Sequence, residues 1–151
     1  MGEGLPLAPG ELELRMSPAG DPESPVVVMS LDAWRGGSPE RIRRMADALA
    51  STLRITVGVL ESEPAPELAP LLRAMTSTLS AAAGGEIRES VHSADIAADL
   101  ALLSDAVART PRASVALAGL LRATQTTDAD DASRAAGKRP RADAVCEPAL
   151  G

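Results

Sequence analysis

The chain has 151 residues, a formal net charge of −6 at pH 7, 45% hydrophobic residues and only 1% aromatic residues. This length suits one domain with its own core, and the core must be aliphatic because Trp34 is the only aromatic residue. The acidic balance disfavours nucleic acid and anionic membrane surfaces as partners, and the lack of aromatic rings disfavours binding of single strands by base stacking.

The N-terminal segment is expected to contain one edge strand. Residues 1–10 are rich in glycine and proline and are interpreted as a flexible lead-in. Polar and apolar residues alternate over Glu11–Arg15, which predicts a half-exposed strand. Turn-forming residues fill 17–24 (SPAGDPES). We therefore expect a hairpin in which 11–16 pairs antiparallel with 25–31 at the edge of a sheet.

Residues 25–60 predict a βαβ unit. Pro25–Leu31 (PVVVMSL) is almost continuously apolar, as in a strand covered by helices on both faces. Ser38 is suited to cap a helix that ends near Ala50, and Arg54–Leu60 (RITVGVL) is a second strand rich in β-branched residues. The helix residues expected to face the core are Ile42, Met45, Ala46, Leu49 and Leu53.

The rest of the predicted domain contains three helices and a weak strand. Leucines at helical spacing define the helices, Gly84-Gly85 ends the first, and the Thr110-Pro111 step separates the last two. The predicted elements are a helix over 67–82, a strand over 86–91, a helix from Ser93 or Asp95 to about Arg109, and a helix from Pro111 to about Ala123.

Together these elements predict an α/β fold: a small, mostly parallel sheet of about three or four strands with helices packed on it. The α/β domain spans 11–123. Residues 124–151 have no apolar period and are polar, charged or small, so they are interpreted as a disordered tail. A loose basic cluster in this tail is interleaved with aspartates and is expected to be solvated; its members are Arg134, Lys138, Arg139 and Arg141.

The compartment is expected to be the cytoplasm. Cys146 is the single cysteine, which excludes an internal disulfide and fits a reducing environment. The N-terminus lacks the basic segment and apolar run of a signal peptide. No apolar run is long enough for a membrane helix.

Four side chains follow the predicted strands at the edge where ligands of parallel sheets bind: Asp32, Glu61, Glu63 and His92. If they converged, they could perform general acid–base catalysis. Acidic residues also occur wherever strands end at solvent, and the sequence favours solvated turns here. His92 is the only histidine, and we expect it at the surface, stabilised by Asp95 and Asp99.

Other candidate sites have simpler explanations. Gly36-Gly37-Ser38 precedes a helix start, where free N–H groups can hold an anion, but it lacks the lysine and spacing of a P-loop, and helix capping accounts for it. Ser62, Ser90 and Ser93 have no nucleophile-elbow context. Trp34 is expected to be a half-buried cover over the sheet edge. We assign no catalytic, cofactor-binding or metal-binding residue.

Three stretches carry a resemblance to a known family: PVVVMSLDAW, ADALASTLRITVGVLESEPAPELAPLLRAMTSTL and DLALLSDAVARTPRASVALAGLLRATQTT. In these the chain resembles actinobacterial members of the enoyl-CoA hydratase/isomerase (crotonase-like) family, and more narrowly the region that precedes the catalytic domain in some of them. The resemblance covers roughly residues 10–128. It implies acyl-CoA chemistry, in which two backbone N–H groups form an oxyanion hole for the thioester carbonyl and carboxylates transfer protons.

If the chain is aligned instead with the catalytic domain itself, the residues at the donor positions do not match that chemistry. The first donor loop would follow the strand at 54–60, where the chain reads Glu61-Ser62-Glu63-Pro64-Ala65-Pro66. Two prolines lack an N–H group, and two carboxylates would oppose a developing oxyanion. Gly84-Gly85 lies too close to the next element to be the second donor loop. No catalytic residue is carried over.

We therefore interpret the chain as an N-terminal module or truncated member of the family, non-catalytic alone and expected to self-associate or to dock on a crotonase-like domain. One alternative is a small acyl-CoA-acting hydratase or isomerase that uses Glu61, Glu63 or His92. Another is a protein-binding module unrelated to CoA.

The resemblance fades near Thr127, where RAAGKRPRADAVCEPALG replaces the apolar helical sequence expected toward a catalytic domain. This predicts a truncated or frameshifted reading frame. Translating the gene downstream in all frames should then reveal crotonase-like sequence. Finding none in any frame would contradict the frameshift.

Overall fold

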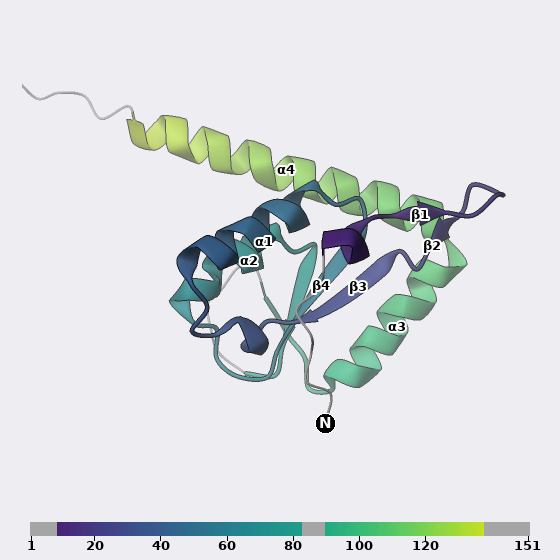
Figure 1. Cartoon of the computed structure of the whole chain (residues 1–151), viewed down its shortest axis with the longest axis horizontal. Coiled ribbons are helices and arrows are strands. Elements are labelled where there is room, and N and C mark those ends of the chain that lie inside the picture. The colour runs from purple at the N-terminus through teal and green to yellow at the C-terminus, as the bar shows by residue number, and fades with distance from the viewer. Residues whose placement is uncertain (1–8, 83–89, 138–151) are drawn as a thin grey trace, which may run out of the picture.

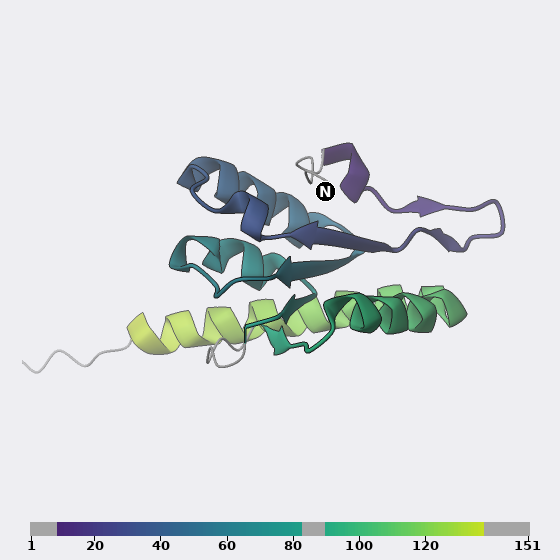
Figure 2. The same ribbon diagram turned by 90° about the horizontal axis from the view of Figure 1, so that it is seen from below.

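The sheet consists of four parallel strands in the order β3-β4-β5-β6. The computed structural model of the chain describes residues 9–82 and 90–137. The strands are β3 (Val26–Ser30), β4 (Ile55–Leu60), β5 (Ser77–Ser80) and β6 (Val91–His92), and Figure 2 shows them side by side in chain order. The predicted α/β class with a parallel sheet is confirmed.

The predicted βαβ unit is present as β3, α1 (Pro39–Ser51) and β4. The Ser38 side chain accepts a hydrogen bond from the Arg41 N–H at 3.3 Å, which caps the helix as its sequence predicts. Proline at the first helical position loses no helical hydrogen bond there. β3 and β4 pair in parallel from Val26 with Ile55 to Ser30 with Val59.

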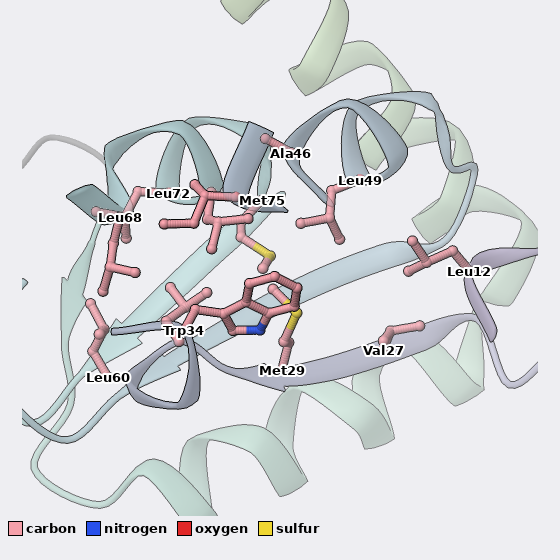
Figure 3. Close-up of a cluster of buried hydrophobic side chains, with 13 residues drawn as sticks. Leu12, Val27, Met29, Trp34, Ala46, Leu49, Leu60, Leu68, Leu72 and Met75 are labelled. Carbon is pink, nitrogen blue, oxygen red and sulfur yellow. The ribbon is translucent and has the colours of Figure 1, made fainter. Parts of the chain in front are cut away.

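α1 and α2 (Ala69–Ala74) cover one face of the sheet, on the opposite side from α3 (Figure 1). A single aliphatic core fills the space between these two helices and the strands (Figure 3). The buried residues of this core are Leu12, Val27, Met29, Leu31, Trp34, Ile42, Ala46, Leu49, Leu60, Leu68, Leu71, Leu72 and Met75.

Trp34 is more deeply buried than predicted. It ends the short 3-10 helix η2 (Asp32–Trp34) and is 4% exposed, whereas the sequence suggested a half-buried cover over the sheet edge. The Arg41 guanidinium lies 4.6 Å from the centre of its ring, a cation–π contact that keeps the charge near solvent while the ring joins the core. Trp34, the only aromatic residue of the chain, therefore contributes to the packing of the core.

Gly58 allows β4 to lie close to the residue that follows β3. A Cβ at this position would come within 2.8 Å of Leu31 Cδ1 and 3.0 Å of Thr78 Oγ1. Leu31 is fully buried, so it cannot move aside without opening the core. Glycine is therefore required by close packing within the strand.

The predicted helix over 67–82 is wrong in its second half. The chain forms the 3-10 helix η3 (Pro66–Leu68) and α2, and then turns into strand β5. Thr76 and Thr56 exchange hydrogen bonds between backbone N–H groups and hydroxyls, at 3.1 and 3.2 Å. These long-range bonds, and the weak helix propensity of serine and threonine, override the leucine spacing.

The predicted N-terminal hairpin is also wrong in its pairing. β1 (Arg15–Met16) pairs antiparallel with β2 (Pro22–Glu23) in a separate two-stranded sheet, and does not pair with β3. The preceding residues form the 3-10 helix η1 (Pro9–Leu12). Arg54 donates to the carbonyls of Glu11 and Ser24. Its side chain therefore attaches the N-terminal segment to the domain, where the sequence predicted backbone pairing between strands.

α3 (Ile96–Arg109) covers the other face of the sheet, and α4 (Pro111–Gly137) contacts both α3 and β4. The Asp95 carboxylate accepts from the Ala98 N–H at 3.0 Å and caps α3. A second, smaller core joins these helices to the strands. Its buried residues are Ile55, Val57, Val107 and Ala118.

α4 continues beyond the predicted helix end at Ala123. It runs to Gly137, so the part of the predicted disordered tail from 124 to 137 is helical. The rest of that tail, 138–151, lies outside the described residues. Most of the predicted strand over 86–91 does so too, and β6 begins at its last residue.

In the described part of the chain, no helix is long and apolar enough to cross a membrane. This agrees with the sequence, in which no sufficiently long apolar run is present.

Two neighbouring leucines test the core. Leu49 is fully buried and Leu53 is 64% exposed, although the sequence placed both on the apolar face of one helix. We expect Leu49→Ala to lower the free energy of unfolding by about 2–5 kcal/mol, because it leaves a cavity, and Leu53→Ala to change it by less than about 0.5 kcal/mol. Urea unfolding measures both, and equal effects would contradict this core.

Candidate functional site: the carboxyl edge of β3 and β4

Asp32 joins the loops that follow β3 and β4. Its Oδ2 accepts from the Glu61 backbone N–H at 2.7 Å, and its Oδ1 accepts from Arg35 Nε at 2.9 Å. The two loops meet because β3 and β4 are parallel neighbours, so their carboxyl ends lie at the same edge.

Arg35 extends this connection. Besides its ion pair with Asp32, its Nη2 donates to the Glu63 backbone carbonyl. The Gly36 N–H donates to Glu67 Oε1 at 3.2 Å, which adds a bond to η3, just before α2. We call this set of contacts between Asp32, Arg35 and residues 61–67 the Asp32 clamp.

The protonation state of Asp32 follows from its partners. Burial by itself would raise the pKa of this carboxyl group, but hydrogen bonds from Glu61 N–H, Arg35 and Ser62 and the charge of Arg35 outweigh it. The pKa therefore lies below its ordinary value of 3.8. Asp32 is ionised at neutral pH and has no proton to give as a general acid.

The four predicted strand-end residues do not form one acid–base group. Asp32 and Glu61 are adjacent, but the contact uses the backbone of Glu61, and the side chains of Glu61 and Glu63 are exposed. His92 is exposed on β6, which β5 separates from β4. The exposure of Glu61, Glu63 and His92 fits the interpretation as solvated residues, whereas Asp32 is half-buried and hydrogen-bonded to the neighbouring loop.

The two aspartates predicted to accompany His92 have other partners. Asp95 caps α3, and Asp99 Oδ2 accepts from Ser93 Oγ at 2.6 Å. Ser93 is buried, so its hydroxyl fixes the start of α3 and is not presented as a nucleophile.

The Gly36-Gly37-Ser38 segment is a capping structure, as the sequence predicts. Ser38 caps α1, Gly36 N–H is bound by Glu67, and Gly37 N–H donates to the Trp34 carbonyl at 3.1 Å. Gly36 has φ +68°, a conformation that glycine adopts without strain. These N–H groups are used within the chain, which leaves little for an anion.

Metal binding finds no support in the part of the chain that the structure describes: no group of three or more His, Cys, Asp or Glu residues there could hold an ion. Gly84-Gly85, Cys146 and the basic cluster from Lys138 to Arg141 lie outside the described residues, and only the backbone of Arg134 is placed, within α4.

No protein-family model, no curated protein and no solved structure matches this chain.

Sequence reasoning identified Asp32 but missed the role of Arg35. An arginine three residues after an aspartate in a loop is a weak signal for an ion pair. The partners at Glu61, Glu63 and Glu67 are about thirty residues away in sequence, and only the parallel pairing of the strands brings them near.

The Asp32 clamp predicts a pH-dependent loss of stability. Because the pKa of Asp32 is lowered in the folded state, its contribution is present above the unfolded value of 3.8 and is lost as pH falls through the folded value. We expect Asp32→Asn to lower the free energy of unfolding by about 1.5–3 kcal/mol at pH 7, and by clearly less at pH 3.

Urea unfolding at both pH values tests this prediction. Glu63→Gln is the matched control: its side chain is exposed, and we expect a change of less than about 0.5 kcal/mol. A deficit for Asp32→Asn that is the same at pH 7 and pH 3 would show that the charge of Asp32 does not matter.

Proposed function

We propose that the chain is a non-catalytic module of the enoyl-CoA hydratase/isomerase (crotonase-like) family, either an N-terminal docking region or a truncated member. The main support for a non-catalytic role is the Asp32 clamp. An oxyanion hole needs backbone N–H groups that are free and aimed at the reacting oxygen. Here the first N–H after β4, that of Glu61, donates to Asp32 Oδ2 at 2.7 Å.

The rest of the loop after β4 also supports a non-catalytic role. Pro64 and Pro66 have no N–H to offer. The carboxylate of Asp32 lies on the Glu61 N–H, at the place where the oxygen of an enolate would have to bind. A negative charge there repels the charge that develops in the transition state.

Exposed apolar side chains support a docking role. Leu102 on α3 and Leu120 on α4 are 68% and 65% exposed. On α4, Leu117 and Leu121 are exposed as well, and apolar side chains gathered in one patch mark contact sites in soluble proteins. We infer that the module contributes a surface to an assembly and leaves the chemistry to another domain or chain.

The proposal predicts that the isolated chain does not hydrate crotonyl-CoA. The loss of thioester absorbance should not exceed the rate without protein, and Asp32→Asn should not create activity, because Pro64 and Pro66 still lack donors. A characterised enoyl-CoA hydratase is the positive control. Turnover well above background would overturn the proposal.

Ligand binding is tested separately by thermal unfolding with crotonyl-CoA at about 1 mM, with free CoA as the control. We expect no rise in melting temperature. A ligand bound only to the native state must raise it, by an amount that grows with concentration. A rise specific to the acyl form would favour the alternative, a small acyl-CoA-binding protein.

A further inference from the structure

α3 and α4 are attached to the sheet by much less buried surface than α1 and α2. The larger core buries several side chains of both α1 and α2. In the second core, the buried residues are Val107 of α3, Ala118 of α4, and Ile55 and Val57 of β4. Because burial of apolar surface is the main source of stability in a folded domain, we expect α3 and α4 to be the more weakly held helices.

The polar contacts between α4 and the rest of the domain add little to this attachment. Arg112 Nε forms an ion pair with Asp21 Oδ1 at 2.8 Å, and its Nη2 donates to the Ala19 carbonyl at 2.8 Å. The two side chains of this ion pair are 63% and 52% exposed, and exposed pairs contribute little stability. Arg122 donates to the Thr52 carbonyl. Burial lowers the pKa of Arg122, so its release into water offsets part of the loss of that bond.

The chain order allows α3 and α4 to separate from the sheet without breaking it. They follow β6, the last strand of the described chain. β6 is held by β5, and the Ser93 N–H donates to the Ser80 carbonyl at 2.8 Å. Ser93 Oγ also donates to Asp99 Oδ2 at 2.6 Å, which fastens the first turn of α3 to β6. The part that can separate therefore begins at about Leu100.

We propose that residues 100–124, which we call the C-terminal lid, open as one unit while β3, β4 and α1 stay folded. Proteins open in contiguous units whose stabilities differ, and the two cores divide this domain into such units. The closed lid covers the apolar strand residues of the second core, and its opening exposes them. These residues are Val26, Ile55, Val57 and Leu79.

This inference goes beyond the proposed non-catalytic function and does not rest on it. The opening depends on how apolar surface and polar contacts are divided between the two sides of the sheet. Turnover of crotonyl-CoA would overturn the proposed function and leave the lid unaffected.

The experiment is amide hydrogen exchange of the full chain, followed by NMR under conditions in which the exchange rate reports the opening equilibrium. After correction for intrinsic rates, we expect the helical amides of the C-terminal lid to exchange at least about thirtyfold faster than the most protected amides of β4 and α1. Equal protection of the lid and of β4 would overturn the proposal.

Two core substitutions distinguish a lid from unfolding of the whole domain. Ile42 is 2% exposed in the larger core, and Val107 is 6% exposed in the second core. Ile42→Val should speed exchange in β4 and α1 about fivefold and change exchange in the lid by less than about twofold, because the larger core stays intact when the lid opens. Val107→Ala should speed exchange about tenfold or more in both the lid and β4, because it destabilises the closed state relative to every open state.

Leu102→Ala is the matched control within the lid. Leu102 is 68% exposed, so its truncation should change exchange in neither unit by more than about twofold. If Ile42→Val speeds exchange by the same factor in the lid and in β4, the domain opens as a single unit and the proposal is wrong.

Discussion

The parallel pairing of β3 with β4 is the interaction on which the other elements depend. It begins where the Ile55 N–H donates to the Pro25 carbonyl at 2.8 Å and ends where the Leu31 N–H donates to Val59 at 2.9 Å. α1 connects the two strands and covers them, and Gly58 provides the space in which Leu31 is buried. With almost no aromatic residues, the domain obtains its core from close packing of aliphatic side chains around this pair.

The same pairing explains why the loops after β3 and β4 are hydrogen-bonded to each other. In parallel sheets the loops at the carboxyl edge are available to bind ligands. Here those loops bind each other, because Asp32 receives the Glu61 N–H and Arg35 holds the Glu63 carbonyl. The hydrogen-bonding groups that could have met a ligand connect the loops to each other. The same hydrogen bonds and the charge of Arg35 lower the pKa of Asp32.

The two faces of the sheet differ in how completely they are covered. α1 and α2 bury a large core on one face, whereas α3 and α4 enclose a smaller core on the other. Over 111–124, α4 packs one side against that core and leaves Leu117, Leu120 and Leu121 exposed on the other. The connected loops at the strand ends therefore stabilise the fold, and large exposed apolar side chains lie on α3 and α4.

The sequence by itself determined the elements whose signals are local. The apolar runs of β3 and β4, the Ser38 cap of α1 and the Asp95 cap of α3 are encoded within a few residues. The tertiary structure decided features that depend on distant partners. Residues 77–80 became a strand because they pair with β4, and the Asp32 clamp formed because strand register placed Glu61 beside Asp32. The leucine spacing over 67–82 favours a helix, and no local pattern records that 77–80 pairs with β4 or which backbone groups the fold brings together.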